Sequence, residues 1–163
     1  MIIIGYPGIG KSSISNSDTR CIDLESSNFF VDDKRPDDWY KYYVQIAQHL
    51  SAQGYTVFVS SHKVVRDELK ATNAEDVAVC FPNTNLKEQW LERLYDRYKR
   101  TRLDKDLRAA MNVEQNYLSN IVELHDEAIK NGWMMIAIGT TNYDLYTDVV
   151  IPALKRSAGN DKQ

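Results

Sequence analysis

Residues 5–12 have the spacing of a phosphate-binding loop, G-x-x-x-x-G-K-S, and they directly follow the apolar segment Met1–Ile4. The glycines of such a loop let backbone N–H groups converge on an anion. In this pattern the lysine, Lys11, reaches the β- and γ-phosphates of a nucleotide, and the serine, Ser12, holds Mg²⁺. The segment therefore predicts a site for the triphosphate of a nucleotide. Its expected ligand-binding residues are Gly5, Gly8, Ile9, Gly10, Lys11, Ser12 and Ser13.

Two carboxylates follow the second predicted strand, at the sheet edge where ligands bind in open parallel sheets. Asp23 and Glu25 are two residues apart, so the alternation of a strand places both side chains on one side. A carboxylate there can accept the proton of an attacking hydroxyl, hold a Mg²⁺-bound water or bind an acceptor's hydroxyls. We expect both to be catalytic and to contact the acceptor, and either of them can be the base. A helix cap or a solvated loop acid is the alternative for each.

Five arginines form a basic group in an otherwise acidic chain. Arg93, Arg97 and Arg100 recur at helical spacing, and Arg102 and Arg108 follow. Fixed positive charge on the transferring group is the main contribution a protein makes to phosphoryl transfer. We expect these guanidiniums to act as phosphate clamps. The alternative is salt bridging to nearby acids. These acids are Glu92, Asp96, Asp104 and Asp106.

The third predicted strand ends in small polar residues, Ser60-Ser61, and no acidic residue follows it. This argues against an ATPase that holds its metal through an acid at the end of that strand. Arg66 lies on the helix that comes next. We expect its side chain to project toward the cleft and bind substrate.

Apolar strand-like segments alternate with helical patterns along the chain, which indicates βαβ units and a parallel sheet with helices on both faces. Only about nine residues separate Lys11 from the second strand, so the helix after the phosphate loop must be very short. Aromatic residues on the helical stripes are expected in the core. The predicted strands are Met1–Ile4, Arg20–Leu24, Thr56–Ser60, Asp76–Phe81 and Trp133–Ile138. The predicted helices carry apolar stripes over residues 39–50, 86–98 and 113–128, and the last of them ends at Asn131-Gly132, a left-handed cap.

The composition indicates a single domain across residues 1–163, with 43% hydrophobic and 26% charged residues. The net charge of −3 provides no general attraction for nucleic acid or an anionic membrane. No signal peptide precedes the loop and no apolar run is long enough to span a membrane, so we expect a cytoplasmic protein. Cys21 and Cys80 lack metal-like spacing and are expected to be buried free thiols. The sequence leaves the oligomeric state undetermined.

From Met1 to about Val150 the chain resembles the small phosphate-loop kinases of metabolites, the nucleoside monophosphate, shikimate and gluconate kinase group. The phosphate loop carries this resemblance, together with the segment 54–69 and with residues 91–97, which are similar to the L-x-R-x-x-x-R helix that opens the mobile lid of this group. The resemblance implies a three-layer α/β/α fold with a five-stranded parallel sheet and a small helical lid at about residues 97–110. It also implies an ATP-dependent kinase that uses Mg²⁺. By this resemblance Arg93 and Arg97 contact the ATP phosphates, and Arg100, Arg102 or Arg108 closes over the transferring group. Arg93, Arg97 and Arg100 are then catalytic, and Arg102 and Arg108 bind substrate.

The phosphoryl acceptor is left open by the sequence. We favour a nucleotide or nucleoside monophosphate, because there are more arginines than ATP needs and because part of an aromatic cluster at positions 29–43 could stack a base. Ordinary packing of that cluster is the alternative. Within the same class, a sugar acid or a hydroxymethylated base in DNA is also possible, and a regulatory NTPase that transfers phosphate only to water is the candidate from another class.

Overall fold

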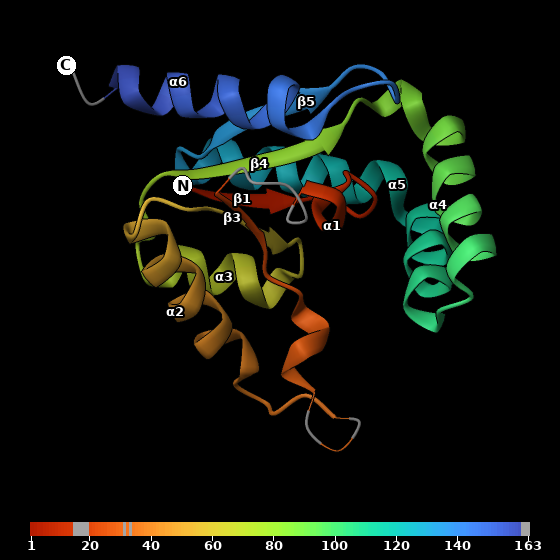
Figure 1. Cartoon of the computed structure of the whole chain (residues 1–163), viewed down its shortest axis with the longest axis horizontal. Helices are drawn as coiled ribbons and strands as arrows, with labels where there is room; N and C mark the ends of the chain where they lie inside the picture. Colours follow the sequence, from red (N-terminus) through yellow and green to blue (C-terminus); the bar gives the residue numbers. More distant parts are fainter. Residues whose placement is uncertain (15–19, 31, 33, 161–163) are drawn as a thin grey trace.

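The computed structural model describes residues 1–14, 20–30, 32 and 34–160, with the side chain of residue 160 excluded (Figure 1). Five strands form one sheet in the order β2-β3-β1-β4-β5, and all neighbouring pairs are parallel. Each strand begins and ends within one residue of the range predicted from the sequence. The strands are β1 (Ile2–Gly5), β2 (Cys21–Asp23), β3 (Thr56–Ser60), β4 (Val77–Pro82) and β5 (Met134–Ile138).

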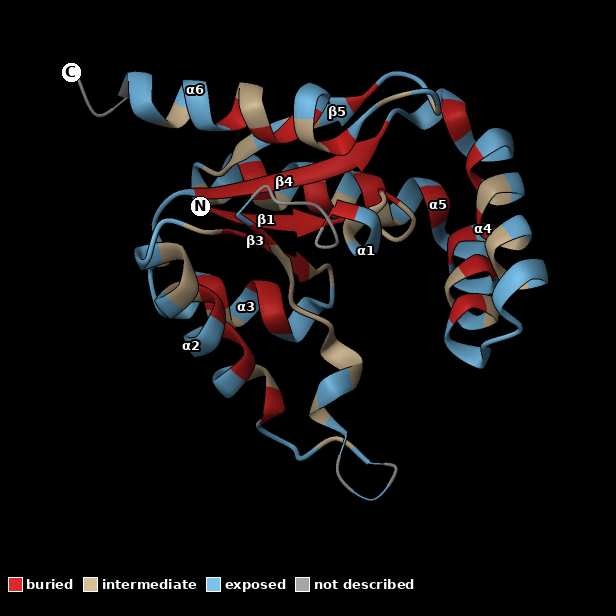
Figure 2. Cartoon of the chain, in the orientation of Figure 1, coloured by how far each residue is buried: buried red, intermediate tan, exposed pale blue. Residues whose placement is uncertain are grey.

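The three inner strands, β1, β3 and β4, are almost entirely apolar, and so is the edge strand β5. All residues of β1 and β4 are buried, as are the first four of β3 (Figure 2). An apolar run without alternation is what a strand covered on both faces requires. The central position of β1 places Gly5, and the loop that follows it, between the carboxyl ends of β3 and β4.

The connections of the sheet place helices on both faces. The chain crosses from β1 to β2 in one direction and then moves across the sheet in the other direction through β3, β4 and β5. Because such crossovers are right-handed, the first connection lies on the opposite face from the later ones. In Figure 1, α5 runs behind β1 and β4, whereas α1 lies on the near side. The α-helices are α1 (Lys11–Ile14), α2 (Trp39–Ala52), α3 (Lys63–Ala71), α4 (Lys87–Thr101), α5 (Asp104–Asn131) and α6 (Ile151–Asn160).

Residues 97–110, expected to form a lid, lie at the tip of a hairpin of α4 and α5. Arg102 adopts a left-handed conformation (φ 56°) that ends α4, and α5 begins two residues later. The hairpin projects beyond the sheet at the right of Figure 1. A kink at Asn116 (φ −123°, ψ 20°) divides α5 between the hairpin and the part that covers the sheet.

Shorter helical turns complete the chain, and aromatic side chains fill the core as predicted. The turns are η1 (Ser26–Phe29), η2 (Thr84–Leu86) and η3 (Tyr146–Val150). Tyr6, Trp90 and Tyr117 are at most 1% exposed and meet edge to face. Both cysteines are buried free thiols, as expected. Among the residues that the structure describes, none of the helices combines the length and apolar character needed to cross a membrane.

A buried tyrosine of α2 joins the carboxyl ends of β2 and β3. The Tyr43 hydroxyl donates a hydrogen bond to the carbonyl oxygen of Leu24 at 2.5 Å and accepts one from the backbone N–H of Ser60 at 2.9 Å. Burial raises the pKa of Tyr43, so the hydroxyl stays protonated and can donate. This side chain therefore fixes the two strand ends that frame one side of the phosphate loop.

We predict that Tyr43→Phe lowers the free energy of unfolding by about 1–3 kcal/mol, because the Ser60 N–H and the Leu24 carbonyl lose their common partner. Tyr42→Phe is the matched control, since Tyr42 is the next residue of the same helix and is 58% exposed. Urea unfolding of the two variants measures the difference. Equal stabilities would contradict a structural role for the Tyr43 hydroxyl.

Candidate functional site

The phosphate loop leaves several backbone donors without partners. Gly8 and Gly10 have φ values of 88° and 96°, which glycine adopts without strain. The amide of Ile9 makes only a long bond, 3.4 Å, to the carbonyl of Tyr6. Within the described part of the chain, no hydrogen bond occupies the N–H groups of Gly8, Gly10 or Lys11. Donors of this kind are normally paired, so a loop that exposes several of them is suited to an anion.

Aromatic side chains from α4 and from the segment after β5 hold this loop from outside. The indole N–H of Trp90 donates to the carbonyl of Pro7 at 2.8 Å, and the hydroxyl of Tyr143 donates to the carbonyl of Ile9 at 2.7 Å. The two rings are stacked, with 6.4 Å between their centroids. A Cβ on Gly8 would lie 2.9 Å from a methyl group of Leu94. The loop thus packs so closely against α4 that Gly8 is required there.

Arg93 lies beside the loop, where the sequence predicted a phosphate contact. Its guanidinium is 5.4 Å from the ring centre of Trp90 and 5.2 Å from that of Tyr143, which are cation–π distances. Nη1 donates to the carbonyl of Thr141 at 3.4 Å, and Nη2 lies 3.5 Å from where a Cβ of Gly10 would be. The rings and the carbonyl therefore hold this positive charge next to the glycine amides.

Lys11, Ser12 and Asp23 form a polar group at the inner end of the loop. The Ser12 hydroxyl donates to Oδ2 of Asp23 at 3.0 Å, and the Lys11 ammonium donates to the carbonyl of Gly5 at 3.4 Å. Oδ1 of Asp23 is buried and has no hydrogen-bond partner among the described residues. A hydroxyl beside a carboxylate offers the hard oxygen ligands that Mg²⁺ prefers, so these residues fit that ion.

Burial shifts both charged groups of this set toward neutrality. It lowers the pKa of Lys11, and the negative charges of Asp23 and Glu25 oppose this. It raises the pKa of Asp23, and the charge of Lys11 opposes that while Glu25 adds to it. Desolvation disfavours the charged form in each case. Asp23 is therefore a stronger base than an ordinary aspartate.

Glu25 is more open and contacts the hairpin. Its Oε2 accepts a hydrogen bond from the Ser27 hydroxyl at 3.1 Å and lies 3.8 Å from the ammonium of Lys105, at the start of α5. The Glu25 side chain is 37% exposed. The structure thus separates the two carboxylates, with Asp23 at the phosphate loop and Glu25 toward the hairpin. Lys105 of the hairpin, which the sequence analysis did not select, lies against Glu25, and its charge also acts on Asp23.

Arg97 has a structural partner as well as a place near the loop. Its Nη2 lies 2.7 Å from Oδ1 of Asp106, a residue only 4% exposed, whose other oxygen accepts a hydrogen bond from Thr101 at 2.6 Å. The charge of Arg97 is one of the smaller influences that lower the pKa of Lys11. Arg100 is exposed and has no ion pair with any described residue. Arg97 therefore forms the salt bridge that was the alternative to a phosphate contact, whereas Arg100 forms none with the described residues.

The structure does not support the substrate-binding prediction for Arg66. This side chain is 5% exposed and is held by two acids of α5, Glu123 at 2.6 Å and Glu127 at 2.5 Å, and by the carbonyl of Ser61. A buried guanidinium needs such compensation, because breaking the pair would leave a charge without water or partner. Arg66 therefore joins α3 to α5 and does not point freely into a cleft.

Arg102 and Arg108, the other predicted substrate ligands, are both exposed. Arg102 ends α4, and its guanidinium lies 6.0 Å from the ring centre of Tyr98. Arg108 has no ion pair with any part of the chain that the structure describes. Within the described chain, no ion pair or hydrogen bond joins either of them to the phosphate loop.

An arginine that the sequence analysis missed lies on the arm between β2 and α2. The Arg35 guanidinium is sandwiched between Phe30 and Trp39, at 4.7 and 4.5 Å from their ring centres, and its Nη2 donates to Ser26 at 3.0 Å. Its Nε is buried without a partner in the described chain. Trp39 in turn meets the ring of His62, 5.9 Å away, whose pKa is lowered by burial and then by the charge of Arg35. Arg35 itself lies outside the helices and strands of the described chain, so no periodicity pointed to it.

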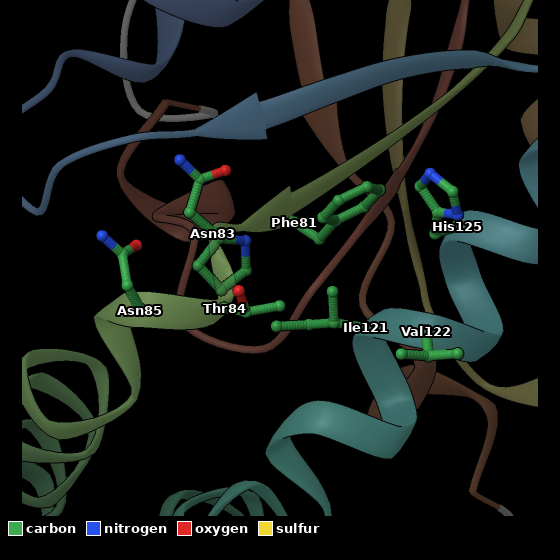
Figure 3. Close-up of a pocket in the computed structure, with 8 residues that line it drawn as sticks. Phe81, Asn83, Thr84, Asn85, Ile121, Val122 and His125 are labelled. Atoms are coloured by element: carbon green, nitrogen blue, oxygen red, sulfur yellow. The ribbon is translucent and has the colours of Figure 1, made fainter.

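A separate hollow of about 420 Å³ lies at the carboxyl end of β4, beside α5 (Figure 3). No residue of the phosphate loop lines it. Its wall is apolar toward the sheet and the helix and polar at η2. The lining residues are Phe81, Pro82, Asn83, Thr84, Asn85, Ile121, Val122 and His125.

The comparisons with known proteins give no assignment. No family model matches the chain, and a search of curated protein sequences gives no significant match. Among the described residues, no group of three or more histidine, cysteine or acidic side chains is placed to hold a metal ion. The function must therefore be argued from the phosphate loop and its surroundings.

We predict that Arg97→Leu lowers the free energy of unfolding by about 1–3 kcal/mol, because buried Asp106 keeps only Thr101 as a partner. Arg100→Leu, three residues further along α4, should change it by less than about 0.5 kcal/mol. Thermal and urea unfolding measure both. If the two variants are equally stable, the Arg97–Asp106 pair does not hold the hairpin together.

Proposed function

We propose that this protein is an ATP-dependent phosphotransferase that moves the γ-phosphoryl group to a small acceptor. The observation that carries the proposal is the set of unpaired N–H groups at Gly8, Gly10 and Lys11, which follow the central strand of a parallel sheet. The ammonium of Lys11 and the hydroxyl of Ser12 lie in the same loop. These are the groups that a nucleoside triphosphate with Mg²⁺ requires.

The sheet and the hairpin support the finer assignment to a phosphate-loop NTPase fold with a small helical lid. The loop connects β1 to α1 at the carboxyl edge of the sheet, the place where ligands bind in open α/β folds. The α4–α5 hairpin stands next to it, and Arg93 and Arg97 of α4 and Lys105 of α5 face the loop or its carboxylates. In this proposal the hairpin is the lid.

The proposed reaction is an in-line attack by an acceptor hydroxyl. Its oxygen forms a bond to the γ-phosphorus while the bond to the β–γ bridging oxygen breaks, so that ADP leaves with the electron pair. The proton of the hydroxyl passes to Oδ1 of Asp23, the carboxylate oxygen that has no other partner. Mg²⁺, when bound, supplies positive charge to the phosphate oxygens. Lys11, Arg93 and Arg97 hold and neutralise the triphosphate.

For the acceptor we favour a nucleotide or nucleoside monophosphate. Arg35 lies between two aromatic rings, and its buried Nε still has a proton to donate, which suits a ligand with an anionic group. A sugar acid also carries an anion, and it is the alternative within the class. A hydroxymethylated base in DNA is less favoured, because the net charge is −3. A regulatory NTPase would transfer phosphate to water alone.

We predict that Lys11→Ala reduces phosphoryl transfer by a factor of about 10² or more while leaving the fold intact, because charge at the γ-phosphate is lost. The assay uses labelled ATP with Mg²⁺ and separate pools of nucleoside monophosphates, sugar acids and hydroxymethylated DNA. Lys63→Ala is the control, since that lysine is exposed and pairs only with Asp67. Undiminished transfer by Lys11→Ala would refute the proposal, and label released only as free phosphate would favour the regulatory NTPase.

The acid limb of the pH–rate profile should lie above the usual range of an aspartate, because burial raises the pKa of Asp23 and the base must be deprotonated. Activity is then full above that pKa and is lost as the pH falls through it. Asp23→Asn should abolish this limb and most of the turnover. If Asp23→Asn keeps its turnover and Glu25→Gln loses it, Glu25 is the base.

A further inference from the structure

His62 lies two residues beyond the end of β3, next to the start of the phosphate loop. Ser60, the last residue of β3, pairs in register with Gly5, which opens that loop. The connections that follow β1 and β3 lie on opposite faces of the sheet. In open α/β sheets, ligands bind at the carboxyl ends of neighbouring strands that diverge in this way. From its position, His62 can therefore contact a ligand that binds beside the phosphate loop.

The ring of His62 does not serve the helix that follows it. His62 is the residue before α3, but its side chain caps none of the N–H groups of that helix. Its Nδ1 lies 2.8 Å from the hydroxyl of Ser60 instead, and its ring meets that of Trp39 nearly at a right angle. Its Nε2 has no hydrogen-bond partner in the described part of the chain. One ring nitrogen is thus held in place, and the other is left for a ligand.

The charges that act on His62 are positive. Burial lowers the pKa of the ring first, and the charges of Arg35, Lys11 and Arg66 lower it further. Two acids of α5 already compensate Arg66, whereas Arg35 has no ion pair with any described residue. Positive charge without a partner attracts an anion. A neutral imidazole at this place adds a hydrogen-bond donor without adding repulsion between cations.

Arg35 and His62 come from different elements but share a neighbour. The ring centre of Trp39 lies 4.5 Å from the Arg35 guanidinium and 5.9 Å from the ring centre of His62. Of the charges that act on His62, that of Arg35 has the strongest effect, so the two side chains are close. Each has one nitrogen without a partner in the described chain, Nε of Arg35 and Nε2 of His62. A group with several anionic oxygens suits such a pair of donors.

We propose that His62 is an acceptor-binding residue, which donates a hydrogen bond from Nε2 to an anionic group that Arg35 binds at the same time. The hydroxyl of Ser60 donates to Nδ1, and this keeps the proton of the ring on Nε2. The inference rests on the proposed function, since that function makes the ligand the phosphoryl acceptor. The anion is the phosphate of a nucleotide or the carboxylate of a sugar acid, and the experiments below distinguish the two.

Steady-state kinetics of two amide variants tests which ring nitrogen matters. The amide nitrogen of asparagine takes the place of Nδ1, and that of glutamine reaches the place of Nε2. We expect His62→Asn to raise KM for the acceptor about tenfold or more and to leave KM for ATP unchanged, because a hydrogen bond to a charged group is lost. His62→Gln should restore KM for the acceptor. The reverse order, with His62→Asn active and His62→Gln impaired, would show a structural role through Ser60 and overturn the proposal. His49→Asn, at an exposed position of α2, is the control.

Histidine NMR tests the contact without turnover. The chain has three histidines, so His49 and His125 are internal references, and His62→Gln assigns the third signal. With Mg²⁺ and ADP present to occupy the loop, we add AMP, CMP, GMP, dTMP or gluconate separately. We expect the His62 signal alone to shift, and the compound that shifts it identifies phosphate or carboxylate. No shift with any of them would overturn the inference, whether or not the protein transfers label from ATP. A shift without label transfer to any acceptor would support the anion site and refute the phosphotransferase.

Discussion

The hydrogen bonds from Trp90 to Pro7 and from Tyr143 to Ile9 are the constraint on which the site depends. They occupy carbonyl oxygens of the loop, so that the N–H groups of Gly8, Gly10 and Lys11, which have no partner in the described chain, are the groups left for a ligand. The stacked rings also support the guanidinium of Arg93. One aromatic pair thus fixes both the shape of the loop and the position of its nearest positive charge.

The strands could be predicted from the sequence because buried strands are apolar runs that can be recognised in it. The runs Ile2-Ile3-Ile4 and Val57-Phe58-Val59 are apolar at every position, which favours a strand covered on both faces in an α/β chain. The edge strand β5 has such a run too, although two of its residues are exposed. The apolar stripe that predicted α5 begins at Val113, nine residues after the helix itself begins at Asp104. Its first turns pack mainly on α4 and bury the polar Asp106, so they lack the apolar period that marks a helix against a sheet.

The candidate site was predictable only in part, for a physical reason. A loop motif specifies its own backbone, so Gly8, Gly10 and Lys11 have the conformation expected. An arginine's position on a helix face does not specify its partner, because the long side chain reaches whichever acid the fold presents. Arg66 meets the acids of α5, and Arg97 meets Asp106. Arg35 was missed because it lies outside any periodic segment, although Trp39, one of its two ring neighbours, begins α2.

The kink at Asn116 has a consequence for the longest helix. Beyond it, α5 is anchored by the Tyr117 hydroxyl on the carbonyl of Asn83 and by the ion pairs of Arg66. Before it, the helix packs mainly on α4, away from the sheet. The ribbon is continuous, but its two halves pack on different elements, so we expect them to open as separate cooperative units. Amide protons ahead of the kink should exchange with solvent sooner than those behind it.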